Sequence, residues 1–261
     1  MRERKTMRVL IIIPAYNEEK SLKRVMEHLK AVCPQLDYLI INDGSTDRTK
    51  AICIENQYHV MHFPENQGLT KVIQTGMRYA LERDYDAALQ FDADGQHLPE
   101  YIESMVSLME ETGCDIVIAS RFKDGKMPFR LRTLGEKLIS AAIRLTTGQS
   151  LTDPTSGMRL YGRRIIRQFA RDSSCAPEPD TIAYMVRMGA NVQEVKVEME
   201  DRKEGKSYLT PVNATKYMIK ELSAILIFQW FRGKENIAKG PDNTQRPEFR
   251  ELESVGGGRK L

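Results

Sequence analysis

Residues 7–19 have the sequence MRVLIIIPAYNEE, a short apolar run that ends at a proline and leads directly into polar residues. An unbroken apolar run of this length predicts a strand buried on both faces, as the strands of a parallel sheet are. In open parallel sheets a ligand binds beyond the carboxyl ends of the strands. We therefore expect the chemistry of this protein to begin in the loop at 14–18.

The same pattern recurs through residue 119. Apolar residues at helical spacing predict a helix at 18–31, and a second apolar run predicts a strand at 38–41. Further helices are expected at 46–56 and 69–81, and further strands at 59–63, 87–91 and 115–119. Alternating strands and helices predict an α/β nucleotide-binding half over residues 7–119. Because the first turn has no GxGxxG, a Rossmann dehydrogenase is disfavoured.

The second half of the chain, residues 120–210, is less regular and is expected to build the acceptor side. A basic loop follows residue 119, a helix is predicted at 134–147, turns alternate with short elements at 153–180, and a strand is predicted at 192–197. Residues 211–232 predict a C-terminal amphipathic helix, so a single domain would cover 1–232. The polar tail at 233–261 has too little apolar surface to offset its ordering entropy and is expected to be disordered.

Composition limits the function classes. The 261 residues are 41% hydrophobic and 29% charged, which suits one large soluble domain. The 39 lysines and arginines barely exceed the 36 acids, so no nucleic-acid partner is expected. Four cysteines without a CxxC pair favour a reducing cytoplasm over a disulfide framework or a zinc knuckle. The apolar runs at 9–13 and 217–231 fall short of the roughly 20 residues that span a membrane.

An acidic turn, Asp92-Ala93-Asp94, follows the fourth predicted strand. Two carboxylates at a sheet edge are hard oxygen ligands that suit Mg²⁺ or Mn²⁺, which would hold a diphosphate and neutralise its charge as it departs. Gln96 and His97 follow in the same turn and are expected either to complete the metal shell or to touch the donor, with an uninvolved surface histidine as the alternative for His97. After the second strand, Asp43 is expected to accept hydrogen bonds from a base or ribose.

Six segments in this order resemble glycosyltransferase family 2, an inverting family with the GT-A fold, and particularly its dolichol-phosphate mannosyltransferase-like and bacterial polyprenyl-phosphate branch. They are PAYNE at 14–18, NDGSTD at 42–47, NQG at 66–68, DADGQH at 92–97, SR at 120–121 and TDPTSG at 152–157. The resemblance covers residues 7–207. It implies a Rossmann-like, mostly parallel central sheet flanked by helices, and a UDP-sugar as the default donor.

The resemblance also implies roles for the matching residues. The donor site would comprise Pro14, Ala15, Tyr16, Glu18, Asp43, Gly68 and Lys71, and the metal site Asp92, Asp94 and Gln96. Arg121 and Arg132 would face phosphate, since a guanidinium binds phosphate oxygens bidentately. Arg202 and Ser207 would belong to a loop that closes over the diphosphate or an acceptor phosphate. We expect this loop and the loop at 122–130 to be poorly ordered without donor.

The acceptor is left open between two hypotheses. A polyprenyl phosphate is already anionic and needs no base, whereas a hydroxyl of a polysaccharide or other glycan needs Asp153, Glu178 or Asp180 as general base. A nucleotide-sugar binding protein without turnover is disfavoured, because the acidic turn and the arginines are present.

The predicted C-terminal helix bears on this choice. Its apolar residues are Ile219, Leu222, Ile225, Leu226 and Phe228, widened by Ile227, Trp230 and Phe231, with Lys216, Lys220, Arg232 and Lys234 as basic neighbours. Such a helix either packs on the core or contacts the cytoplasmic leaflet or a small membrane partner protein.

Overall fold

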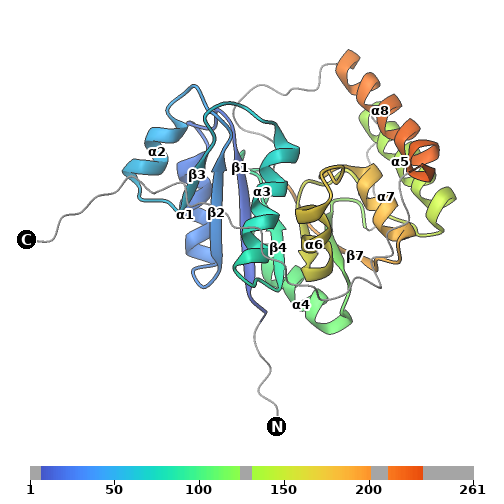
Figure 1. Cartoon of the computed structure of the whole chain (residues 1–261), viewed down its shortest axis with the longest axis horizontal. Helices are drawn as coiled ribbons and strands as arrows, with labels where there is room; N and C mark the ends of the chain where they lie inside the picture. Colours follow the sequence, from blue (N-terminus) through green and yellow to red (C-terminus); the bar gives the residue numbers. More distant parts are fainter. Residues whose placement is uncertain (1–6, 124–130, 201–210, 232–261) are drawn as a thin grey trace, which may run out of the picture.

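A computed structural model describes residues 7–123, 131–200 and 211–231. Its centre is a seven-stranded sheet in the order β3-β2-β1-β4-β6-β5-β7 (Figure 1). All neighbouring strands are parallel except at β6, which is antiparallel to both β4 and β5. The strands are β1 (Val9–Ala15), β2 (Asp37–Asn42), β3 (Val60–His62), β4 (Ala87–Gln90), β5 (Ile116–Ser120), β6 (Arg159–Gly162) and β7 (Val192–Lys196).

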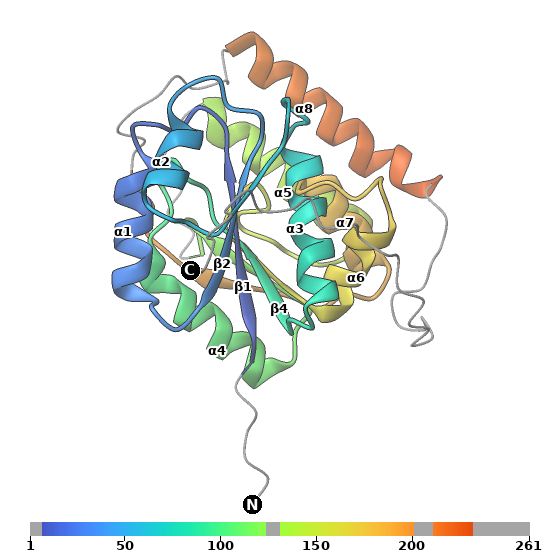
Figure 2. The same ribbon diagram turned by 60° about the vertical axis from the view of Figure 1, so that its left-hand side comes forward.

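Helices cover both faces of the sheet, and the expected α/β class is confirmed. Figure 2 shows α1 and α4 on one side of the strands and α3, α6 and α7 on the other. Each side has its own apolar core, because strands buried on both faces direct alternate side chains to opposite faces. The helices are α1 (Leu22–Val32), α2 (Thr49–Glu55), α3 (Leu69–Glu82), α4 (Ile102–Thr112), α5 (Leu131–Thr147), α6 (Arg163–Arg171), α7 (Pro179–Arg187) and α8 (Pro211–Leu226).

The strand register brings the polar loops together. Ala15 pairs with Asn42 across β1 and β2, and Ile12 pairs with Gln90 across β1 and β4. The carboxyl ends of these three parallel strands therefore meet at one edge of the sheet. Because β6 runs the opposite way, its first residue, Arg159, pairs with Gln90 and reaches the same edge.

The structure differs from the sequence expectations in several places. The helices predicted to begin at 18 and 46 begin at Leu22 and Thr49, because the residues before them form turns that bond to each other. The predicted C-terminal helix ends at Leu226 and continues as a short 3-10 turn (Phe228–Trp230). Residues 124–130 of the loop predicted to be poorly ordered at 122–130, the loop at 202–207 and the tail at 233–261 lie outside the described residues.

Candidate active site

The acidic turn after β4 is held by its own residues. The backbone N–H of Gln96 donates to Asp94 Oδ1 (3.0 Å), and the backbone N–H of Asp92 donates to Nδ1 of His97 (2.9 Å). The His97 ring is buried and packs edge-on against Phe91. The alternative that His97 is an uninvolved surface residue is therefore wrong, because its ring fastens the turn from inside.

Space is kept open beside the Asp92 carboxylate. A Cβ atom at Gly157 would lie 2.8 Å from Asp92 Oδ2, so any other residue there would fill the space next to this oxygen. The Asp92 side chain is 34% exposed, and its hard oxygens suit Mg²⁺ or Mn²⁺. Within the described ranges, no three His, Cys, Asp or Glu side chains converge as a metal cluster. The Nε2 atom of Gln96 lies 3.4 Å from the backbone carbonyl oxygen of Glu200.

The residues expected in the nucleotide pocket gather at the ends of β1 and β2. Asp43 is buried, and its two carboxylate oxygens accept hydrogen bonds from the backbone N–H groups of Gln67 (2.7 Å) and Gly68 (2.9 Å). The Asp43 backbone N–H donates to the carbonyl oxygen of Ala15 (2.9 Å). Asp43 thus ties the start of α3 to the end of β1, a function that the sequence did not suggest.

The remaining residues of this pocket lie close to these. Pro14 and Ala15 end β1, and Tyr16 follows in the loop. Glu18 is held by a bond from its backbone N–H to Thr49 Oγ1 (2.8 Å). Lys71 lies in the first turn of α3 and is exposed.

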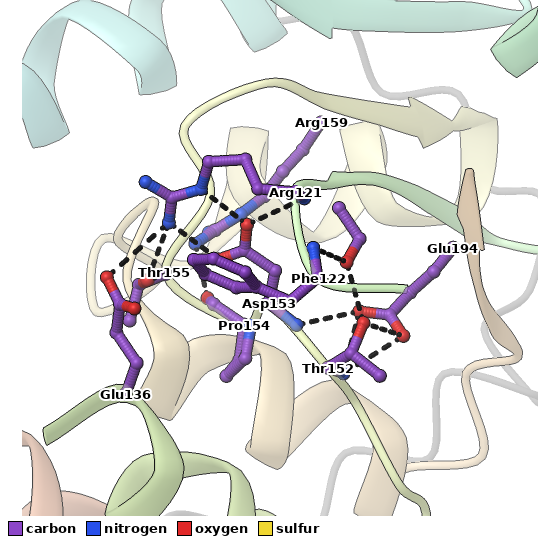
Figure 3. Close-up of polar contacts among 10 residues, drawn as sticks. Arg121, Phe122, Glu136, Thr152, Asp153, Pro154, Thr155, Arg159 and Glu194 are labelled. Atoms are coloured by element: carbon purple, nitrogen blue, oxygen red, sulfur yellow. Dashed lines mark hydrogen bonds and ion pairs between the residues drawn. The ribbon is translucent and has the colours of Figure 1, made fainter. Parts of the chain in front are cut away.

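Arg121 and Asp153 form a bidentate ion pair (Figure 3). Arg121 Nε and Nη2 donate to Asp153 Oδ2 (2.7 Å) and Oδ1 (2.8 Å), while Glu136 lies 3.6 Å from Nη2. Burial alone would lower the pKa of Arg121, but the bonds to Asp153 and the charge of Glu136 raise it above its ordinary value. Asp153 is fully buried with both oxygens bonded to Arg121. This geometry suits a residue that positions Arg121 and does not suit a general base.

Glu194 on β7 supports the same loop and was missed by the sequence analysis. Its carboxylate accepts hydrogen bonds from the backbone N–H groups of Thr152 (2.9 Å) and Asp153 (3.0 Å) and from Thr152 Oγ1 (2.9 Å) (Figure 3). No motif marks this residue, because its role depends on the pairing of β5 with β7.

A cleft of about 410 Å³ joins these groups. Asp92, Gln96 and His97 line one part of it, and Arg121, Glu136, Arg159, Glu178 and Tyr217 line the rest. Tyr217 on α8 donates through Oη to Glu178 Oε2 (2.7 Å), and burial followed by the Glu178 charge raises the pKa of Tyr217. Asp180, by contrast, is not among the lining residues. The sequence analysis missed Arg159 and Tyr217.

Three predicted site residues are not placed. Arg202 and Ser207 lie outside the described residues, and the helix α5 includes position 132, but the side chain of Arg132 is outside the described part. The cleft therefore brings together Asp92, Gln96, Arg121 and Glu178 from the predicted set.

The arrangement of the sheet is similar to that of a solved structure, glucosyl-3-phosphoglycerate synthase from Mycobacterium tuberculosis in complex with Mn²⁺, UDP and phosphoglyceric acid. The TM-score is 0.61, with 17% sequence identity, over 85% of this chain and 78% of that chain. The expected GT-A fold is confirmed.

Residues 10–169 match the profile of Glycosyl transferase family 2, and the chain belongs to this family. It is 30% identical to polyprenol monophosphomannose synthase of Mycolicibacterium smegmatis, over 91% of this chain and 92% of that protein. It is 32% identical to undecaprenyl-phosphate mannosyltransferase of Micrococcus luteus, over 78% of this chain and 88% of that protein. The resemblance to the polyprenyl-phosphate branch is thereby confirmed.

Proposed function

We propose that this protein transfers a sugar, with inversion, from a nucleoside diphosphate sugar to a polyprenyl phosphate at the cytoplasmic face of a membrane. UDP is the default nucleotide. One observation carries the proposal: the acidic turn and Arg121 line a single cleft, so a donor and an anionic acceptor would meet in one space. Similarity along almost the whole length to an enzyme named for a polyprenol acceptor supports the choice of acceptor.

Asp92 and Asp94, with Gln96 beside them, are the residues that would hold Mg²⁺ or Mn²⁺. When bound, the cation would neutralise the charge that develops on the departing diphosphate. The open space opposite Gly157 supports this assignment, because it leaves Asp92 Oδ2 accessible. The side chains of Asp43 and Glu18 would border the nucleotide in the neighbouring loops.

Arg121 is suited to receive an acceptor phosphate. Asp153 fixes its Nε and Nη2, and Figure 3 shows the third nitrogen, Nη1, directed away from Asp153. A guanidinium fixed in this way loses little conformational freedom when it binds an anion. Since a phosphate acceptor carries its own negative charge, no side chain has to remove a proton during the attack.

A glycan hydroxyl as acceptor would require a base. Glu178 is the carboxylate to test in that case, because it lines the cleft, whereas Asp153 is bonded to Arg121 and Asp180 lies away from the cleft. If transfer to a glycan were observed, the acceptor would be a glycan hydroxyl, and Glu178 would be the base to test.

The helices α5 and α8 pack against each other at one side of the molecule and form the proposed membrane surface (Figure 1). Their exposed apolar side chains are Leu134, Leu138 and Leu145 on α5, and Ile219, Leu226, Ile227, Phe228, Trp230 and Phe231 on and after α8. Exposed Lys137, Arg144, Lys216 and Lys220 lie among them, as anionic headgroups would favour. Across the described ranges, no helix is long and apolar enough to cross a membrane. We propose that this surface contacts lipid directly, because its basic residues suit anionic headgroups.

Two experiments test the proposal. UDP-glucose, UDP-galactose, UDP-N-acetylglucosamine and GDP-mannose are each incubated with the protein in Mn²⁺ or EDTA, and the released nucleoside diphosphate is measured. We expect release from one donor in Mn²⁺ only. Release that is equal in EDTA would contradict the metal assignment.

Flotation with anionic liposomes tests the membrane surface. We expect the wild type to float and the double variant Trp230→Ser/Phe231→Ser to remain in the soluble fraction. Ile54→Ser is a matched control, because Ile54 is about as exposed as Trp230 (61% and 58%) but lies on α2, away from α5 and α8. Equal loss of flotation in the control would contradict the assignment of the surface.

A further inference from the structure

The floor of the cleft contains buried polar atoms without hydrogen-bond partners. They are Gln90 Oε1 and Arg159 Nε and Nη1, and none makes a hydrogen bond of ordinary geometry among the described residues. Tyr161 Oη, two residues along the same strand, likewise makes none, although it is close enough to Arg159 to raise the pKa of that guanidinium. Gln90 is 2% exposed and Arg159 is 1% exposed. Leaving such a group unsatisfied costs about 1–3 kcal/mol, so this floor is suited to a ligand that completes its hydrogen bonds.

Gln90 and Arg159 lie directly opposite each other, because they are paired residues on the adjacent strands β4 and β6. Arg159 is anchored by a bond from Nη2 to the carbonyl oxygen of Pro154 (2.8 Å). Gln90 is anchored by a Nε2 contact to Asp92 Oδ1 (3.4 Å), which leaves its carbonyl oxygen for another donor. Gln90 Oε1 and Arg159 Nε and Nη1 thus remain available to a bound molecule.

The position of this pair is set by the acidic turn. Gln90 precedes Asp92 by two residues, and its Nε2 lies 3.4 Å from Asp92 Oδ1, so the pair borders the acidic turn directly. A sugar is covalently joined to the diphosphate that the acidic turn would hold. The sugar is thus the part of the donor that we place beside Gln90 and Arg159, which line the same cleft as Asp92.

The chemistry of the surrounding groups also favours a sugar over a phosphate. Arg159 offers only donors, Gln90 Oε1 and Glu178 offer acceptors, and each sugar hydroxyl both donates and accepts. A phosphate, which mainly accepts, would be repelled by Glu178 and by Gln90 Oε1. Burial alone would lower the pKa of Arg159, but Tyr161, Tyr217 and Glu178 raise it, so the guanidinium remains charged.

We propose that Gln90, Arg159, Glu178 and Tyr217 form the subsite for the transferred sugar, and that Gln90 and Arg159 select which sugar is accepted. This assignment rests on the proposed function, since it requires a nucleotide-sugar donor. Buried polar groups that bond a substrate hydroxyl discriminate strongly against a substrate without it, because they are then left unpaired.

The test measures binding and needs no turnover. Isothermal titration in Mn²⁺ gives Kd values for the free nucleoside diphosphate, for the preferred donor of the hydrolysis screen, and for its single deoxy analogues. The proteins are wild type, Gln90→Leu, Arg159→Met and Arg159→Lys, which keeps the charge but loses the planar fork. Gln74→Leu is a matched control, because Gln74 is also a buried glutamine, bonded to the carbonyl oxygens of residues 173 and 175.

We expect each subsite variant to weaken donor binding roughly 10- to 100-fold, as loss of a hydrogen bond to a charged or buried group does, with nucleoside diphosphate binding unchanged. One deoxy analogue should bind wild type weakly, yet bind Gln90→Leu or an Arg159 variant as well as the intact donor does, because the partner of the missing hydroxyl is already absent. Gln74→Leu should retain the wild-type discrimination between analogues.

Three results would overturn the assignment. Equal weakening of nucleoside diphosphate and donor would show that the pair binds phosphate or supports the fold. Donor binding with unchanged discrimination in all variants would refute the sugar subsite but leave the proposed function intact. Failure of wild type to bind any donor of the screen would refute the proposed function and the subsite together.

Discussion

Glu221 on α8 is a buried carboxylate whose ionisation should destabilise the fold. Its Oε2 accepts a hydrogen bond from the backbone N–H of Asp180 at the start of α7 (3.3 Å). Burial raises the pKa of Glu221 to about 7, and the charges of Glu178 and Asp180 act in the same direction. Lys220 Nζ lies 3.6 Å from Glu221 Oε1. Its charge and the bond from the Asp180 amide lower the pKa of Glu221, but only partly offset the rise.

The magnitude follows from linkage. Between pH 4.5 and about 7 the folded protein binds a proton at Glu221 that the unfolded chain has lost, so the free energy of unfolding falls as pH rises. The stabilising contribution is complete below pH 4.5 and is lost as pH rises through about 7. At about 1.4 kcal/mol per pH unit, the total loss is about 3 kcal/mol.

The substitution Glu221→Gln removes this penalty because an amide does not ionise. Its oxygen can still accept the bond from the Asp180 amide. Urea unfolding at pH 5 and pH 8 should show that the variant gains about 2–3 kcal/mol on wild type between these two values. Glu55→Gln is the control, because Glu55 is exposed and pairs with exposed Arg48. A difference between Glu221→Gln and wild type that is equal at both pH values would refute the reasoning.

Three further predictions concern the site and its supports. Asp94→Ala should lose Mn²⁺-dependent donor hydrolysis at a cost of no more than about 1 kcal/mol in stability, because relief of like-charge repulsion in the acidic turn offsets the lost bond from the Gln96 backbone N–H; wild-type turnover would contradict the metal assignment. Asp153→Asn should lower the free energy of unfolding by about 3–5 kcal/mol in urea titrations, since it leaves Arg121 with an incomplete buried ion pair, and a loss below about 1 kcal/mol would contradict this role. Gly44→Ala should cost more than Gly113→Ala by more than about 1 kcal/mol in the same titrations. Both glycines have positive φ, but a Cβ at Gly44 would lie 2.3 Å from a backbone atom and one at Gly113 meets nothing within 4 Å, so equal losses would contradict the steric argument.

The first half of the fold could be predicted because its signals are local. The apolar run that becomes β1 and the helical spacing in α3 depend on neighbouring residues, and both elements were found close to their true bounds. The strand β6 was not predicted, since it has only four residues and contains a buried arginine. It is a strand because β4 and β5 supply its hydrogen-bond partners on both sides.

The candidate site, like the fold, could be predicted from the sequence only where its residues are close together along the chain. The acidic turn is visible in the sequence because both carboxylates and the preceding strand lie within a few residues. The pairing of Arg121 with Asp153, by contrast, joins residues 32 positions apart. Because only the folded chain brings them together, the sequence predicted a separate role for each residue and did not predict their ion pair. The residues of the proposed sugar subsite were missed for the same reason, since Arg159 carries no motif.

The most direct test of the proposed function follows the sugar. The donor found in the hydrolysis screen is supplied with a radiolabelled sugar, together with a polyprenyl phosphate and Mn²⁺, and the reaction is extracted with organic solvent. We predict that label enters the organic phase with wild type and fails to enter it with Asp94→Ala. Label that stays out of the organic phase and is found instead on an added soluble glycan would contradict the proposed acceptor.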